Sequence, residues 1–252
     1  GYADFGKKKQ LDKTSAFQLA SVSKQFTAAA IMLLYERNQI KLTDTINNYF
    51  PNFPYDNVTI KNLLNHTAGL PKYFWITEHK WDGDEAPTNS EMMTLIEESD
   101  VLRFFKPGQK FDYSNTGYAV LASIVEKVSG TSFSDFVQQH IFDALGMENS
   151  FVYSYKNDKI KENQLAGYRL YRGWRHLKIG GSVNDAIVGD KNIYTNSEDL
   201  YKWYQGLNNG NILSKTSLDL MYTEGKTIYG KNVPYGFGFR IDTKDIKTIY
   251  HH

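Results

Sequence analysis

Two side chains near the start of the chain have the types and the spacing needed to attack a carbonyl carbon. Ser21 and Lys24 form the only Ser-x-x-Lys pattern in the 252 residues, and an apolar run that predicts a helix follows at 28–34. On a helix, residues three apart lie on one face, so the hydroxyl and the amine meet. A serine needs a nearby base to become a nucleophile, and a lysine with a lowered pKa can be that base. The positive end of the helix dipole disfavours an additional proton on Lys24.

The same pair has a purely structural interpretation. Ser21 could be a helix N-cap whose hydroxyl accepts a hydrogen bond from the first turn, and Lys24 could be a solvated side chain. The following helix carries an apolar stripe that indicates burial, formed by Val22, Phe26, Ala29 and Leu33. A four-residue pattern does not decide between these interpretations, so a second motif is needed.

A second candidate segment, Tyr113-Ser114-Asn115, follows a Pro-Gly turn and precedes an amphipathic helix predicted at 118–128. In extended backbone, residues two apart point the same way, so Tyr113 and Asn115 can face one site. A phenol near a lysine can pass protons to and from a serine hydroxyl, and an amide can hold both the lysine and a substrate carbonyl. The alternative is a packed tyrosine followed by an asparagine N-cap.

The composition excludes several classes of function. Hydrophobic residues make up 41% and charged residues 23%, and the net charge is +1, so no charge excess indicates binding to nucleic acid or to an anionic membrane. The longest apolar run, at 28–34, is too short to span a bilayer. Zero cysteines exclude disulfides, thiolate metal sites and a cysteine nucleophile. No pattern predicts a metal or a cofactor.

The order of predicted elements indicates an α+β protein. Helices fill the middle of the chain and strand-like segments occupy both ends, so we expect an antiparallel sheet formed by the chain ends with a helical subregion inserted at about 40–195. The long segment 72–90 is predicted to be an irregular lid. The other predicted helices lie at 60–65, 90–105, 134–145 and 198–207, and two final strands lie at 235–241 and 247–250.

Taken together, the two motifs resemble those of the penicillin-recognising serine hydrolases. This family includes class C β-lactamases, D-alanyl-D-alanine carboxypeptidases and related esterases and D-peptidases. The segment 63–70 is similar to the family's Leu-Leu-x-His-x-Ser-Gly-Leu, and 107–118 matches almost residue for residue. The segment 189–195 resembles Gly-Gly-Leu-x-Ser, with Asp190 in place of the second glycine. The resemblance covers nearly the whole chain and implies one β-lactamase/transpeptidase-like domain over residues 1–252.

The resemblance also implies a role for each residue of the two motifs. Ser21 would be the acylated nucleophile, and Lys24 would activate it. Tyr113 would shuttle protons, and Asn115 would orient Lys24 and the substrate. The Ser21 backbone N–H would be one of two donors to the oxyanion. Which group acts as the general base stays open, and His66 is expected to be structural.

The activity that the resemblance implies is that of a serine hydrolase, which works through a Ser21 acyl-enzyme on an ester, peptide or β-lactam carbonyl. The implied partner is therefore a small-molecule or peptide substrate. The family is bacterial, and the resemblance alone implies a periplasmic or secreted location. A different class of function stays open as well. A relative without turnover, either a ligand sensor or a scaffold, would also keep these motifs.

The third family motif, Lys-Thr-Gly or His-x-Gly, is incomplete in this chain. Lys-Thr pairs occur at 226–227 and 247–248, but neither is followed by glycine. His251-His252 stands where the motif should begin, and we predict that His251 binds substrate in the same cleft as Ser21. The competing explanation is the remnant of a purification tag. We further expect an incomplete family domain, because the family has strands before and after the residues present here.

Overall fold

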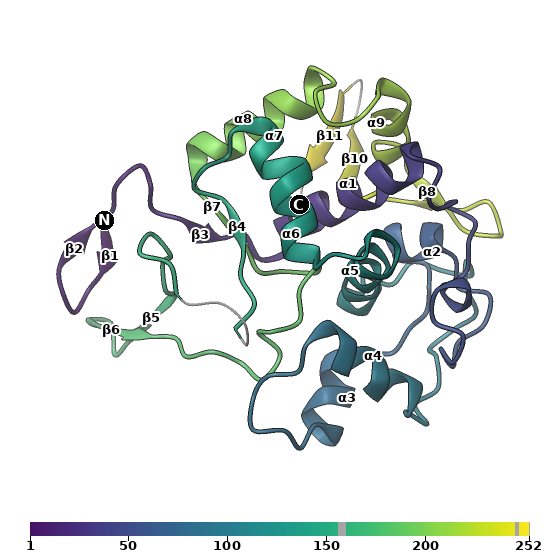
Figure 1. Ribbon diagram of the computed structural model, residues 1–252, viewed down its shortest axis with the longest axis horizontal. Helices are drawn as coiled ribbons and strands as arrows, with labels where there is room; N and C mark the ends of the chain where they lie inside the picture. The colour runs from purple at the N-terminus through teal and green to yellow at the C-terminus, as the bar shows by residue number, and fades with distance from the viewer. Residues whose placement is uncertain (156–159, 245–246, 252) are drawn as a thin grey trace.

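The central element of the fold is the helix that follows the candidate nucleophile. The computed structural model describes residues 1–155, 160–244 and 247–251, with only the backbone at 243, 244 and 247–251. Helix α1 (Ser23–Glu36) packs against α5 (Asn115–Ser129), α6 (Phe133–Val137) and α9 (Lys215–Met221), as Figure 1 shows. Nearly every residue of α1 up to Leu34 is buried. A helix that is apolar on all sides is stable only inside a core, which is where α1 lies.

The helices that support α1 agree with the predicted ones. The amphipathic helix expected at 118–128 is α5, and it ends at Gly130, whose φ of 72° gives the left-handed C-terminal cap. The helix expected at 134–145 consists of α6, a π-helical segment at Gln138–Phe142 and α7 (Asp143–Leu145). Both predictions are confirmed.

The prediction of an irregular lid at 72–90 is wrong in its first half. Helix α3 (Tyr73–Lys80) occupies it, because Tyr73, Ile76 and Thr77 recur at helical spacing and are all buried. The remaining helices are α2 (Ile60–Leu64), α4 (Asn89–Glu97), α8 (Ser197–Asn208) and the short 3₁₀ turns η1 (Ala20–Val22) and η2 (Ile46–Asn48).

The helix predicted at 90–105 is too long, because α4 ends at Glu97. The backbone beyond it bonds to other segments instead of continuing the helix. The Val101 carbonyl accepts a hydrogen bond from the Tyr55 hydroxyl at 2.6 Å, and the Phe104 N–H donates to the Gly69 carbonyl at 2.8 Å. The apolar residues at 101–105 therefore lie in a loop.

A small antiparallel sheet leads the chain into the candidate site. Strand β3 (Phe17–Gln18) pairs with β7 (Ile193–Thr195), and β7 also pairs with β4 (Phe151–Val152). In the register between β3 and β7, Gln18 lies opposite Tyr194. The sheet thus fixes the residues just before Ser21 against a segment that is far away in the sequence.

The other strands form local hairpins. Phe5 lies between the first two strands of the chain and stacks on His176, with ring centroids 3.7 Å apart. The hairpin that contains Phe5 and the hairpin that contains His176 therefore lie side by side at one end of the molecule (Figure 1). The hairpins are β1 (Tyr2–Asp4) with β2 (Lys9–Gln10), β5 (Tyr168–Tyr171) with β6 (Arg175–Lys178), β8 (Gly225–Lys226) with β9 (Asn232–Val233), and β10 (Arg240–Lys244) with β11 (Lys247–His251).

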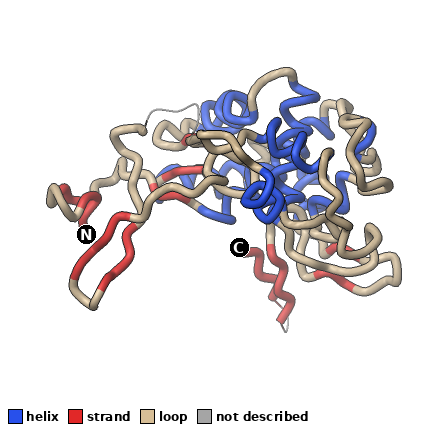
Figure 2. Tube along the Cα trace, turned by 90° about the horizontal axis from the view of Figure 1, so that it is seen from below, coloured by secondary structure: helices blue, strands red, loops and turns tan. Residues whose placement is uncertain are grey.

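The α+β class is confirmed, but the pairing differs from the one we predicted. Among the described strands, those at the two ends of the chain do not share a sheet, since β1 pairs with β2 and β10 pairs with β11. Strands joined by a short turn pair at little cost in loop entropy, which favours these hairpins. Figure 2 shows β10 and β11 extending away from the helices.

Candidate active site

The turn between β3 and α1 presents Ser21. Ala20, just before it, has a φ of 47°, a left-handed conformation that an alanine adopts only when its surroundings impose it. Two hydrogen bonds to Ile193 in β7 hold the turn from both sides. The Leu19 N–H donates to the Ile193 carbonyl at 2.8 Å, and the Ile193 N–H donates to the hydroxyl of Ser23 at 3.1 Å.

Lys24 lies directly beside Ser21 and has no exposed surface. Its Nζ donates hydrogen bonds to Ser21 Oγ at 3.3 Å and to the backbone carbonyl of Asp190 at 2.8 Å. Burial lowers the pKa of Lys24 from its ordinary 10.5 to about 8. The Asp190 carboxyl group works against this shift, whereas the cations Arg240 and Lys191 add to it. A fraction of Lys24 is therefore free amine near neutral pH.

Tyr113 completes the cluster around the lysine. Lys24 Nζ lies 5.1 Å from the centroid of the Tyr113 ring and 5.6 Å from that of Tyr118. Burial raises the pKa of Tyr113, and its hydrogen bond with Ser21 and the charge of Arg240 only partly oppose this rise. The phenol therefore keeps its proton near neutral pH and can donate it.

Asn115 is the first residue of α5, and extended backbone at Ser114 separates it from Tyr113, as predicted. Its Oδ1 is buried and, among the described residues, has no hydrogen-bond partner. Within the same residues Lys24 bonds to Ser21 and Asp190, not to Asn115 as the resemblance implied.

His66 supports the Tyr113 segment from behind. It is buried, its Nδ1 accepts a hydrogen bond from the Ser114 N–H at 3.1 Å, and its carbonyl accepts one from the Asp112 N–H at 2.9 Å. Its ring also packs on Tyr113, with centroids 4.3 Å apart. These contacts agree with a structural role.

Sequence reasoning missed Arg240, the first residue of β10. Its guanidinium carbon lies 5.1 Å from the centroid of the Tyr113 ring, so it adds a positive charge to the site. The turn before it packs tightly on α1. Gly238 has a φ of 83°, and a Cβ there would lie 2.8 Å from Gln25 Cα. The two glycines at 236 and 238 were the available signal that this segment approaches another backbone closely.

The backbone of β11 brings the predicted His251 to the same region. In the β10–β11 register, His251 lies opposite Arg240. The side chain of His251 and all of His252 lie outside the described residues. Substrate binding by His251 therefore stays a prediction.

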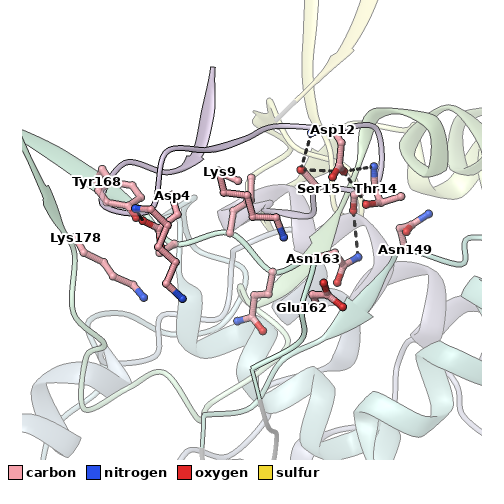
Figure 3. A pocket seen from close by; sticks show the side chains of 15 residues that line it. Asp4, Lys9, Asp12, Thr14, Ser15, Asn149, Glu162, Asn163, Tyr168 and Lys178 are labelled. Atoms are coloured by element: carbon pink, nitrogen blue, oxygen red, sulfur yellow. Dashed lines mark hydrogen bonds between the residues drawn. The ribbon is translucent and has the colours of Figure 1, made fainter.

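A cavity of about 740 Å³ opens between the β1–β2 and β5–β6 hairpins (Figure 3), and it contains none of the four predicted catalytic residues. Charged side chains of both signs line it, among them Asp4, Lys9, Glu162 and Lys178. Among the described residues, no group of His, Asp and Glu side chains could hold a metal ion.

Comparison with known proteins agrees with the resemblance seen in the sequence. The model of the Beta-lactamase family matches residues 1–252. The chain belongs to this family, which is a family of serine hydrolases. It is 34% identical over 248 residues to Penicillin-binding protein 4* of Bacillus subtilis and 30% identical over 242 residues to a putative penicillin-binding protein of the same organism. The two matches cover 95% and 96% of this chain, but only 55% and 57% of the length of the two relatives.

Solved structures share the fold. A penicillin-binding protein from Bacillus halodurans has a TM-score of 0.82 and 25% identity, and the match covers 97% of this chain and 74% of that one. A D-amino acid amidase from Ochrobactrum anthropi has a TM-score of 0.77 and 23% identity, and the match covers 100% of this chain and 73% of that one. No helix within the described residues of this β-lactamase family chain is long and apolar enough to cross a membrane.

Proposed function

We propose that this protein hydrolyses an ester, peptide or β-lactam carbonyl through an acyl-enzyme on Ser21. The observation that carries the proposal is the hydrogen bond of 3.3 Å between the fully buried Lys24 Nζ and Ser21 Oγ. With a pKa of about 8, roughly a tenth of Lys24 is free amine at pH 7. A buried amine in contact with a serine hydroxyl on a strained turn is arranged to take the proton of that hydroxyl.

In the proposed acylation, Ser21 Oγ forms a bond to the carbonyl carbon while its proton moves to Lys24 Nζ. The carbonyl electron pair moves to oxygen, where the Ser21 backbone N–H at the start of the helix stabilises the negative charge. Collapse of this intermediate breaks the bond to the leaving alcohol or amine. Tyr113 donates the proton that the leaving group needs and regains one from Lys24, because its raised pKa keeps it protonated.

Hydrolysis repeats the sequence with water. A water molecule loses a proton to Lys24 and attacks the acyl carbon, and Ser21 leaves with a proton returned through Tyr113. Asn115 Oδ1 would accept a hydrogen bond from the substrate amide, since it has no partner among the described residues. No step requires a metal or a cofactor.

Arg240 supports a substrate class with an anionic group near the reacting carbonyl. Its guanidinium carbon and Lys24 Nζ both lie 5.1 Å from the centroid of the Tyr113 ring, so two cationic groups surround this tyrosine. Guanidinium groups bind carboxylates well because two N–H donors match two oxygens.

We propose that residues 1–252 form one catalytic domain. We also propose that the protein acts outside the cytoplasm, as the penicillin-binding relatives suggest.

A covalent probe tests the proposal. A fluorophosphonate or a fluorescent penicillin should label the wild-type chain, and Ser21→Ala should abolish labelling without changing the circular dichroism spectrum. Labelling that persists in Ser21→Ala would remove Ser21 as the nucleophile. Loss of the penicillin signal with time indicates turnover, whereas a permanent signal indicates a sensor-like relative.

A further inference from the structure

A carboxyl group that the family resemblance does not predict lies buried on Asp190, the residue whose backbone carbonyl binds Lys24. Asp190 stands where the similar segment has a second glycine. It is 1% exposed, and its backbone carbonyl accepts the 2.8 Å hydrogen bond from Lys24 Nζ. Burying a carboxyl group is costly unless its surroundings compensate it, so the surroundings of Asp190 show what the group can do.

The carboxyl group has one fixed partner. Its Oδ2 accepts a hydrogen bond from the hydroxyl of Tyr73 at 3.1 Å, whereas its Oδ1 is buried and has no hydrogen-bond partner among the described residues. Lys191 lies nearby, but its ammonium is partly exposed and already pairs with Asp185 at 2.9 Å. Lys24 is therefore the fully buried cation that the Asp190 charge acts on.

The loop that carries Asp190 is held tightly between α1 and α5. Gly189 has a φ of 104°, and a Cβ there would lie 2.5 Å from the Tyr118 carbonyl oxygen. The Gly189 carbonyl accepts a hydrogen bond from the Thr27 hydroxyl at 2.6 Å. The side chain of Asn89 bonds to both the N–H and the carbonyl of Val188, at 2.8 and 3.1 Å. The carboxyl group thus cannot move away from the lysine without unpacking the core.

We propose that Asp190, held by the hydroxyl of Tyr73, is a positioning residue that stabilises the ammonium form of Lys24 during acylation. This inference rests on the proposed function. When Lys24 takes the Ser21 proton, a new positive charge forms in a buried site that already contains the charge of Arg240. The carboxylate offsets that charge, while the backbone carbonyl of the same residue keeps Nζ directed toward Ser21.

The charges that face Lys24 give the sign of the effect. Arg240 and Lys191 lower the pKa of Lys24, and Asp190 is the anion that raises it. Burial raises the pKa of Asp190 itself, while Lys24, Lys191 and the Tyr73 hydrogen bond favour its ionised form. Replacing the carboxylate by an amide should therefore lower the pKa of Lys24 and weaken it as a base.

The test is the pH dependence of acylation in the chain as it stands. The rate constant for fluorophosphonate labelling of Ser21 is measured from pH 5.5 to 10 in wild type and in Asp190→Asn. We expect the midpoint of the acid limb, near pH 8 in wild type, to move down by on the order of one pH unit. The rate on the plateau should fall by up to about tenfold, since a base weaker by one pKa unit accepts the proton less readily.

Two further variants separate charge from structure. Thr27→Val removes the hydrogen bond to Gly189 in the same loop without changing any charge, so its midpoint should stay at the wild-type pH even if its melting temperature falls. Tyr73→Phe keeps the carboxyl group but removes its fixed partner, so its midpoint should move in the direction of Asp190→Asn by a smaller amount. If Asp190→Asn does not fold, the inference is tested by comparing Tyr73→Phe with Thr27→Val. Equal pH midpoints of labelling in these two variants would overturn it.

The outcomes distinguish this inference from the proposed function. Labelling that does not depend on Ser21 refutes the acyl-enzyme itself. Labelling that depends on Ser21, with the same midpoint and plateau in wild type and Asp190→Asn, refutes the role of Asp190 and leaves the acyl-enzyme in place. A downward shift together with a slower plateau supports both.

Discussion

The buried Lys24 predicts an unusual dependence of stability on pH. Its pKa is about 8 in the folded chain and near 10.5 when exposed in the unfolded chain. Between these values the unfolded chain binds a proton that the folded chain has released, so the free energy of unfolding rises with pH. Below pH 8 the penalty for burying this amine is fully present, and it disappears as the pH approaches 10.5.

The size of the effect follows from the shift. Each pKa unit corresponds to about 1.4 kcal/mol, so Lys24 should make the folded state on the order of 2 kcal/mol more stable at pH 10 than at pH 7.5. The variant Lys24→Met keeps the length of the side chain but cannot titrate. The contribution of Lys24 is therefore the pH-dependent part of the difference between wild type and this variant.

The assay is urea unfolding of both proteins at several pH values between 7 and 10, followed by circular dichroism. Wild type should gain stability relative to Lys24→Met as the pH rises, whether or not the variant is active. The comparison cancels every other titrating group that the two proteins share. Parallel curves, differing by a constant amount from pH 7 to 10, would refute the lowered pKa and with it the argument that Lys24 supplies free amine.

Three other substitutions test the geometry of the site. Tyr113→Phe should reduce turnover by roughly 10²-fold, measured as kcat on a p-nitrophenyl ester, and a wild-type kcat would leave Tyr113 with a structural role only. Arg240→Gln should raise KM several-fold for an ester with a carboxylate near the scissile bond and leave KM for a matched neutral ester unchanged; equal effects on both esters would contradict the proposed anion preference. Gly238→Ala should destabilise the fold by about 2 kcal/mol in urea unfolding, because its φ of 83° and the contact with Gln25 Cα both disfavour a side chain. An unchanged urea midpoint would refute this tight packing.

The sequence predicted those parts of the site whose chemistry is local. Ser21 and Lys24 are three residues apart, and the structure joins them by the hydrogen bond that the helical spacing implies. The position of Tyr113 relative to Lys24 also agrees, because the resemblance to the family supplied a long-range contact that the spacing alone could not. Within the described residues, Lys24 Nζ bonds to Ser21 and to Asp190 and not to the Asn115 amide, so the role of Asn115 stays a prediction.

The two main errors in the fold have different causes. Helix α3 was missed because Trp75, His79 and Lys80 interrupt the apolar pattern, although the buried side at Tyr73 and Ile76 has helical spacing. The predicted sheet between the chain ends assumed that strands at both ends would pair with one another. The described strands pair mostly with their neighbours in the sequence. The two exceptions are the pairings of β3 and of β4 with β7, the strand whose Ile193 holds the turn at Ser21.

Asp190 shows what sequence reasoning alone leaves out. An aspartate in place of a glycine predicts an exposed side chain, because carboxyl groups are seldom fully buried. Its burial results from a contact with Tyr73, which is 117 residues away in the sequence, and from the tight passage of Gly189 past α5. Burial also gives the charge its effect, since water would screen the same carboxylate at the surface and leave the proton affinity of Lys24 almost unchanged. The residue that we propose to control the base is thus defined by packing, whereas the proposed nucleophile and base are defined by their spacing in the sequence.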